Sequence, residues 1–210
     1  MANDVSPSLR GALEERIRSH DRAGAVAAAL AALDDGSVSV ADLYRVLSEI
    51  LVDIGAAWEE GTAEVWHEHF VTGIVRNIVE ATVLKVEEAA PPDRTATVVL
   101  AAPSDEYHDL GLRMLTDRFT LAGWHAHFLG ANVPVDELIS AVDELGADAV
   151  ALSASTHFHR VVLKAYVTTL TGARPDLRVW VGGPAFAREH AGWPEEVVLD
   201  PLDIPSPNDR

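Results

Sequence analysis

The stretch "VVLAAPSDEYHDLGLRML", residues 98–115, decides the fold prediction. Its apolar start, 98–102, is typical of a buried strand. A polar loop follows, and the spacing of the apolar residues from Leu112 to Leu115 then predicts a helix. In an open α/β fold, ligands bind beyond the carboxyl end of such a strand. The loop lacks the glycine patterns that hold nucleotide phosphates, so we expect a different ligand here.

The composition is that of a folded, acidic protein. The chain has 210 residues, of which 48% are hydrophobic, enough for one or two domains with a real core. A formal charge of −17 argues against direct binding of nucleic acid or an anionic membrane. The absence of cysteine excludes disulfides, thiolate ligands and a cysteine-linked chromophore. No stretch resembles a signal peptide or a membrane span of about 18 apolar residues, so we expect a cytoplasmic protein.

Residues 7–90 are predicted to form a bundle of four helices. Apolar residues recur three to four positions apart in each of four windows. Gly36 and Gly61 end two of these windows, and Thr62 is the expected N-cap of the last. The two prolines in 90–94 cannot continue a helix, which makes this segment the linker to a second domain. The windows are residues 8–20, 23–36, 40–61 and 62–89.

Residues 95–200 are predicted to form a doubly wound parallel sheet, because strand-like and helix-like segments alternate. The segment 196–200 is a candidate fifth strand, and the proline-containing tail 201–210 is expected to be flexible. The predicted strands are 95–103, 124–130, 148–155 and 178–184, and the predicted helices lie near 109–122, 134–145 and 157–172.

The polar loop after the first strand contains His108. A histidine there can simply be solvated, but Glu106 can accept a hydrogen bond from one ring nitrogen, which leaves the other free to bind a metal. Gly111 leaves room for a bulky group at the start of the helix. One protein ligand is too few for zinc but suffices for a haem or a corrin, which bring their other ligands with them.

The segment "EYHDLG", residues 106–111, resembles the D/E-x-H-x-x-G signature of cobalamin-binding domains. Two further elements of that family follow at the expected places, "LSAST" at 152–156 and "VGGP" at 181–184. The resemblance implies that His108 is the lower axial ligand of cobalt and that the other two elements line a channel for the nucleotide tail. Taken alone, the hydroxyls could merely cap the next helix, and the glycines could merely form a turn. The resemblance assigns the cofactor to Glu106, His108, Asp109, Gly111, Ser153, Ser155, Thr156, Gly182 and Gly183.

The helical part contains Trp58, Glu68 and His69, which resemble the W-x9-E-H pattern of CarH-type photoreceptors. This implies adenosylcobalamin, with the bundle covering its upper face, the tryptophan on the adenosyl group and the other two side chains in the same cavity. The alternatives are a core tryptophan and a solvated carboxylate. Some family members have a cobalt-binding histidine directly after the tryptophan, but Glu59 stands here, and His67 and His69 are the local substitutes.

The function that the resemblance implies is that of a light sensor and not of an enzyme. Photolysis of the cobalt–carbon bond would change the conformation or association of a homodimer or homo-oligomer that acts on an unidentified partner protein. We expect this protein to act without the DNA-binding domain that is usual in CarH-type regulators. The alternatives are a corrinoid methyl carrier for a methyltransferase system and a ligand-binding domain without cobalamin.

Three H-x-H pairs invite a zinc interpretation. Helical residues two apart point in different directions, which argues against two of the pairs, and no third ligand can be named for the strand pair. Stand-alone relatives called photocobilins also hold a bilin, and the segment 157–160 could serve a noncovalent bilin such as biliverdin. The pairs are His67/His69, His125/His127 and His157/His159, and Phe158 and Arg160 complete the candidate bilin residues.

Overall fold

The computed structural model describes residues 6–186, 192–194 and 197–207. The chain divides into two compact units, a helical unit that extends to Glu88 and a sheet unit that begins at Ala89, next to the predicted linker. Within the described residues, no helix is both long and apolar enough to cross a membrane.

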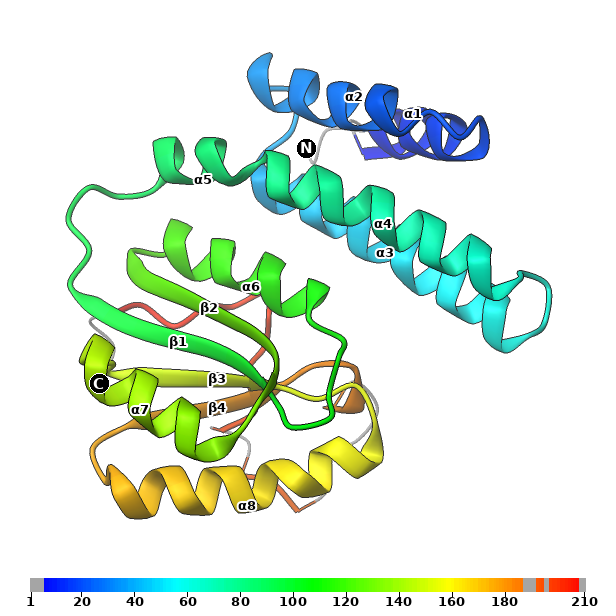
Figure 1. The fold of residues 1–210 in the computed structure, drawn as a ribbon. Coiled ribbons are helices and arrows are strands. Elements are labelled where there is room, and N and C mark those ends of the chain that lie inside the picture. The colour runs from blue at the N-terminus through cyan, green and yellow to red at the C-terminus, as the bar shows by residue number, and fades with distance from the viewer. Residues whose placement is uncertain (1–5, 187–191, 195–196, 208–210) are drawn as a thin grey trace. The chain divides into compact units, whose positions relative to one another are not determined.

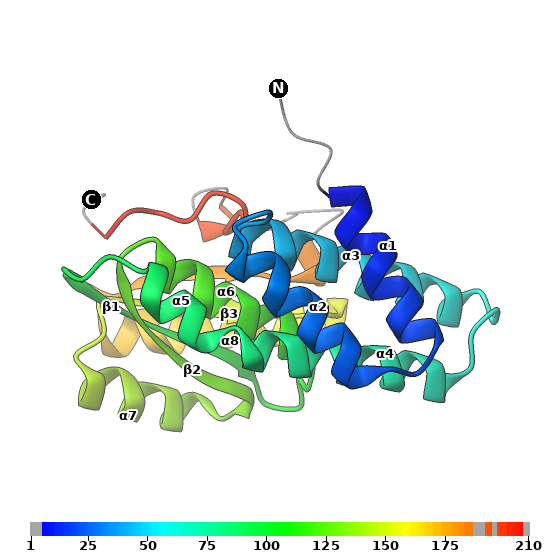
Figure 2. The same cartoon turned by 90° about the horizontal axis from the view of Figure 1, so that it is seen from above.

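The helical unit contains the four long helices that the sequence predicts. Helix α1 packs against α2, and α3 packs against α4 (Figures 1 and 2). Leu43 and Leu47 of α3 and Ile74 and Ile78 of α4 are buried, so the apolar stripes form the core as expected. The helices are α1 (Ser6–Arg18), α2 (Arg22–Asp34), α3 (Val40–Glu59), α4 (Val65–Ala81) and the short α5 (Val83–Ala89).

The start of α4 differs from the prediction. Thr62 is not its N-cap, because the helix begins at Val65 and Glu64 occupies the cap position without a side-chain hydrogen bond. Thr62 instead donates its hydroxyl to the carbonyl oxygen of Ala57 at 3.0 Å. Its side chain therefore completes the end of α3, where the last carbonyl groups also need partners.

The predicted helix 62–89 is broken at Thr82. The hydroxyl of Thr82 donates to the Val79 carbonyl oxygen at 2.7 Å and lies 2.7 Å from the buried hydroxyl of Tyr44. A threonine that bonds the preceding turn and a tertiary partner competes with the regular helix pattern. The chain consequently ends α4 at Ala81 and starts α5 at Val83.

The sheet unit is a doubly wound parallel sheet with strand order β2-β1-β3-β4, which confirms the predicted fold class. The chain winds in opposite directions on the two sides of β1, so β1 and β3 flank the switch point where such folds bind ligands. Its elements are β1 (Ala96–Pro103), α6 (Leu110–Leu121), β2 (Trp124–Val133), α7 (Val135–Leu145), β3 (Ala149–Ser153), α8 (His157–Ala173), β4 (Arg178–Gly182) and the 3₁₀ turn η1 (Pro184–Phe186).

The prediction of a fifth strand at 196–200 was wrong. The structure describes residues 197–200 of this segment, and they form no strand. Only one isolated bridge forms, between Val181 and Val198, and the Leu199 N–H donates to the Val181 carbonyl oxygen at 2.8 Å. The next N–H needed to extend a parallel ladder belongs to residue 201. Pro201 has no N–H, so the ladder stops.

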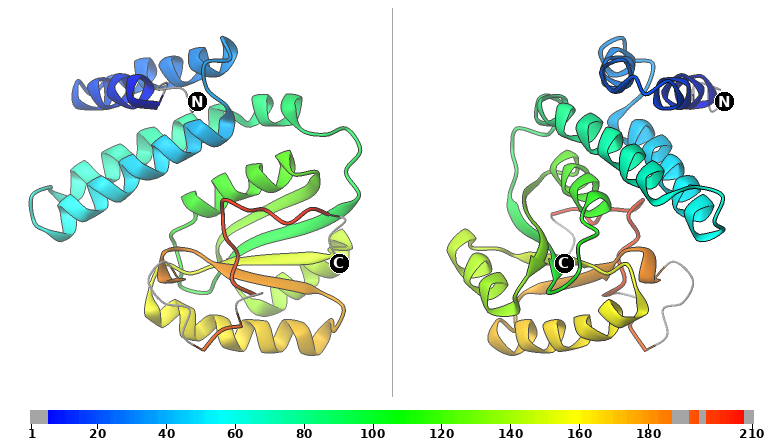
Figure 3. Two further views of the ribbon diagram at one scale, coloured as in Figure 1. Left: turned by 180° about the vertical axis from the view of Figure 1, so that it is seen from behind. Right: turned by 45° about the vertical axis from the view of Figure 1, so that its right-hand side comes forward.

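The two faces of the sheet are covered differently. Helices α7 and α8 pack on one face, whereas the other face carries α6 and a segment without helix or strand, 199–205, which we call the C-terminal strap (Figure 3). The Trp124 indole N–H donates to the Pro205 carbonyl oxygen at 2.8 Å, and Arg118 donates to that of Pro201 at 2.8 Å. The described part of the predicted flexible tail, 201–207, has no helix or strand but is hydrogen-bonded to the sheet unit.

Candidate cofactor site

The loop that joins β1 to α6 is held in one conformation by the end of β2. Asn132 accepts the Asp105 N–H on its side-chain oxygen at 2.9 Å and donates its own N–H to the Glu106 carbonyl oxygen at 2.9 Å. Asp105 and Asn132 both have positive φ, of 66° and 55°, a conformation that these two residue types tolerate better than most. The pair fixes the backbone from which Glu106 projects.

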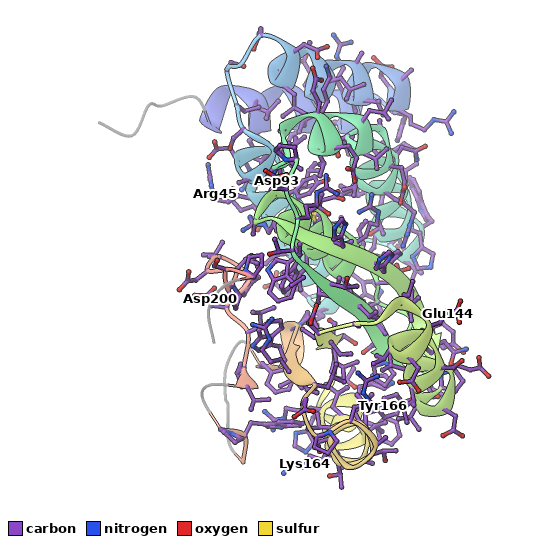
Figure 4. All side chains as sticks on the ribbon, turned by 90° about the vertical axis from the view of Figure 1, so that its left-hand side faces the viewer. Arg45, Asp93, Glu144, Lys164, Tyr166 and Asp200 are labelled. Carbon is purple, nitrogen blue, oxygen red and sulfur yellow. The ribbon has the colours of Figure 1, made fainter. Side chains whose placement is uncertain are left out.

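A second anchor comes from Tyr166 of α8, labelled in Figure 4. Its buried hydroxyl donates to the Val133 carbonyl oxygen at 3.0 Å and accepts the Ser104 N–H at 2.9 Å. One side chain therefore ties together the carboxyl ends of β1 and β2. This rigidity supports a site built on the loop, because ligand-binding side chains need a fixed scaffold.

The Glu106 side chain has no exposed surface, and both of its oxygens are occupied. Oε1 accepts the His108 N–H at 3.0 Å and lies 2.7 Å from His108 Nδ1. Oε2 accepts the Ser155 N–H at 2.7 Å and the Ser155 hydroxyl at 2.6 Å. Burial by itself would raise the pKa of Glu106, but the hydrogen bonds from Ser155 and His108 outweigh it and lower the pKa to about 2. Glu106 is therefore ionised near neutral pH.

The side chain of His108 is 75% exposed, although its Nδ1 contacts the buried carboxylate. An ionised carboxylate 2.7 Å from Nδ1 favours a proton on that nitrogen. In the neutral imidazole, Nε2 is then unprotonated, and none of the described residues bonds it. A neutral imidazole with one nitrogen anchored and the other open is the arrangement that a metal-binding histidine requires.

Gly111 lies in the first turn of α6 and is exposed. A Cβ atom at this position would meet no described atom within 4 Å, so packing within the protein does not demand a glycine. Glycine nevertheless destabilises a helix by about 0.5–1 kcal/mol relative to alanine. The glycine therefore leaves the start of α6 clear of side-chain atoms. Asp109, at the N-cap position, accepts the Arg113 N–H on its carbonyl oxygen at 2.8 Å.

The Gly-Gly turn packs directly against the end of β3. Gly183 has a φ of +96°, and a Cβ there would lie 2.6 Å from both Ser153 Oγ and the Ala154 carbonyl oxygen. Gly182 differs, because its nearest neighbour would be the Leu199 carbonyl oxygen at an ordinary 3.6 Å. The turn therefore requires glycine at 183 for its own geometry and brings Ser153 beside it.

Thr156 caps α8, as the more ordinary interpretation of this residue suggests. Its hydroxyl accepts the His159 N–H at 3.3 Å and lies 2.9 Å from His159 Nδ1. His159 Nδ1 also lies 2.9 Å from Glu106 Oε2. His159, which the sequence analysis considered for a bilin, therefore contacts the same carboxylate as His108. The one signal of this contact in the sequence is that His159 lies four residues after Ser155.

The sheet unit thus brings nine of the predicted residues to the carboxyl edge of the sheet, whereas the other three belong to the helical unit. Trp58, at the end of α3, is 48% exposed, so it is not a core tryptophan. Glu68 is more than a solvated carboxylate, because it accepts the Thr72 hydroxyl at 2.7 Å and lies 2.5 Å from His69 Nδ1. Trp66, which the prediction did not use, is also exposed and stacks on His67 with 3.6 Å between ring centroids.

Two further histidines have partners of their own. His125 Nε2 lies 3.1 Å from the Arg94 carbonyl oxygen, and His157 Nδ1 lies 2.9 Å from the Arg160 guanidinium. In the described part of the chain, no three His, Asp or Glu side chains are grouped so that they could hold a metal ion.

Comparison with known proteins agrees with this geometry. Residues 96–198 match a family model described as a B12 binding domain, and residues 9–82 match a second model with the same description. The HTH-type transcriptional repressor CarH of Myxococcus xanthus is 38% identical over 156 residues, which are 74% of this chain and 50% of CarH. This chain therefore spans about half the length of CarH.

Corrinoid proteins are a second group of relatives. Dimethylamine corrinoid protein 1 of Methanosarcina acetivorans is 22% identical over 150 residues, which are 70% of this chain and 69% of that protein. The monomethylamine corrinoid protein of Methanosarcina barkeri has the same fold, with a TM-score of 0.73 at 20% identity over 90% of this chain and 88% of that one. With a matching domain in each of its two units, the chain belongs to the B12 binding domain family and is a cobalamin-binding protein.

Proposed function

We propose that this protein is an adenosylcobalamin-dependent light sensor and not an enzyme. When bound, the cofactor would supply a cobalt–carbon bond that light can break. The observation that carries the proposal is the exposure of Trp58, a large aromatic side chain left without a core role at the position where the CarH-type pattern has its adenosyl-binding tryptophan. The 38% identity to CarH supports the same assignment.

In this proposal, His108 is the lower axial ligand of cobalt. Support comes from the open Nε2 and from the ionised Glu106, which holds the proton on Nδ1. Gly111 leaves the start of α6 clear for the corrin ring. Ser153 and Gly182 at the edge of the sheet are proposed to lie along the nucleotide tail.

The helical unit is proposed to hold the upper adenosyl group. Trp58 offers an aromatic surface for adenine, and Glu68 can accept hydrogen bonds from ribose hydroxyls. Loss of the group would uncover Trp58 and remove a partner of Glu68. An empty cavity and a polar group without its partner each cost about 1–3 kcal/mol, enough to change a two-state ratio about tenfold or more.

The upper side of cobalt after illumination has three candidate ligands in this proposal. Glu59 stands where some family members have a cobalt-binding histidine, which favours water as the ligand. His67 and His69 are the other candidates, and both are engaged in the structure, by Trp66 and Glu68 respectively. Recruiting either histidine would first have to break that contact.

The second candidate function is that of a corrinoid methyl carrier for a methyltransferase system. The fold shared with the monomethylamine corrinoid protein favours it, as do the dimethylamine corrinoid relatives. A methyl group needs no aromatic surface above the corrin. In that case Trp58 would have no part in selecting the upper ligand.

Two of the side chains that were considered for a bilin near the start of α8 already have partners in the protein. His157 contacts Arg160, and His159 contacts Glu106. Of the side chains considered for a bilin, Phe158 is exposed. The proposed function therefore includes no bilin.

The test loads the protein with adenosylcobalamin and compares its size by size-exclusion chromatography with light scattering, in the dark and after green light. We expect a change in hydrodynamic radius or association in the parent protein and a smaller change in Trp58→Ala. Trp66→Ala is the matched control, because Trp66 is equally exposed but lies outside the pattern. Identical dark and lit profiles, together with equal affinities for adenosylcobalamin and methylcobalamin, would leave the methyl carrier as the function.

A further inference from the structure

The carboxylate of Glu106 contacts one side chain, that of His159, which is not among the residues that the cobalamin-binding signature assigns to the cofactor. Oε1 serves His108, and Oε2 serves the N–H and the hydroxyl of Ser155. His159 Nδ1 lies 2.9 Å from the same Oε2. This is an ion-pair distance, and the contact is attractive when Nδ1 carries the proton, because a carboxylate only accepts hydrogen bonds.

The position of the His159 ring is determined by the start of α8. Its backbone N–H bonds the Thr156 hydroxyl, and the same hydroxyl lies 2.9 Å from Nδ1. Only 13% of the His159 side chain is exposed. A ring held from both the cap and the carboxylate is part of the built site and not a mobile surface group.

The neighbouring histidine shows that this placement is specific. His157 lies two residues earlier in the same turn, so its side chain points in a different direction from that of His159. Its Nδ1 contacts the Arg160 guanidinium at 2.9 Å instead of the carboxylate. The two histidines share a helix start and differ in one relevant respect, the contact with Glu106.

We propose that His159 is a positioning residue that holds His108 in the orientation for binding cobalt and acts through Glu106. This inference rests on the proposed role of His108 as the lower ligand. Two histidines would share one buried carboxylate, with His108 on Oε1 and His159 on Oε2. The contact of Oε2 with α8 keeps Oε1 turned toward His108. Without His159, Ser155 alone holds Oε2, so the carboxylate and the His108 ring are oriented less firmly.

The experiment uses the full chain loaded with cob(II)alamin and measures its electron paramagnetic resonance spectrum and its affinity. A histidine nitrogen bound to cobalt adds a further splitting to the cobalt lines. We expect this splitting in the parent protein. In His159→Leu, which has no polar atom to offer Oε2, we expect most of the splitting to disappear and cobalamin affinity to fall about tenfold. His159→Asn places its amide nitrogen, bonded to Cγ, where Nδ1 lies in the parent protein, and should restore both.

His157→Leu is the control on the same helix turn and should behave like the parent protein. Circular dichroism of the cofactor-free variants checks that each one folds. Parent-like splitting and affinity in His159→Leu would overturn the positioning role while leaving His108 as the ligand. Absence of nitrogen splitting in the parent protein itself would overturn the ligand assignment and the positioning role together.

Discussion

Replacing Glu106 with glutamine tests how much the buried carboxylate stabilises the sheet unit before any cofactor binds. The variant keeps the size of the side chain and removes its charge. The pKa of Glu106 is about 2 in the folded protein against an ordinary 4.5, and this difference corresponds to about 3 kcal/mol of stability at neutral pH. We therefore expect Glu106→Gln to lower the free energy of unfolding by about 3 kcal/mol at pH 7.

The pH dependence follows from the direction of the pKa change. A carboxyl group whose pKa is lowered by folding contributes fully above its unfolded value and loses that contribution as the pH falls through the folded value. The stability difference between the parent protein and Glu106→Gln should thus be constant above about pH 4.5 and shrink toward pH 2. Other carboxylates titrate in both proteins, so their effects cancel in the difference.

Urea denaturation at several pH values, followed by tryptophan fluorescence, measures this difference. Trp124 and Trp180 are buried in the sheet unit and should report its unfolding. Glu144→Gln is the control, because Glu144 is an exposed carboxylate on α7 (Figure 4). Equal stabilities of Glu106→Gln and the parent protein at pH 7, or a difference that does not change with pH, would refute the reasoning.

Three further predictions concern the sheet unit. Gly183→Ala should destabilise it by about 2–3 kcal/mol in urea denaturation, because a Cβ would clash at a positive φ, whereas Gly182→Ala should change little. Gly111→Ala should raise the stability of the cofactor-free protein by about 0.5–1 kcal/mol and weaken cobalamin binding in a titration; unchanged affinity would contradict a corrin beside α6. Trp124→Phe removes the hydrogen bond to Pro205 and should cost about 1 kcal/mol, and a neutral result would show that this bond does not hold the strap.

Periodicity predicted most of the fold, and it failed where a single side chain decides the outcome. The strands and helices of the sheet unit lie within a few residues of their predicted positions, because apolar periodicity reflects burial directly. Thr82 interrupts the predicted helix through its bond to Tyr44, 38 residues away, which local pattern cannot show. Thr62 has the residue type of an N-cap but bonds the preceding helix instead.

The site was predictable to the extent that its residues are close in sequence. Glu106 and His108 are two residues apart, so their hydrogen bond could be expected from chemistry. Ser155 reaches the same carboxylate from 49 residues away and needed the family resemblance. His159 was considered only for a bilin, and its contact with Glu106 could not be predicted, because the helix cap at Thr156 that places it beside this carboxylate exists only in the folded sheet unit.

The C-terminal strap makes the order of synthesis matter for this protein. The Trp124 indole in β2 bonds the carbonyl of Pro205, which leaves the ribosome 81 residues later. Until then, the sheet face that carries Trp124 and Trp180 lacks part of its cover and keeps apolar surface in water. A nascent chain that pauses before residue 199 would thus expose an aromatic surface to chaperones or to other chains. Variants truncated before residue 199 would carry the same exposed face permanently.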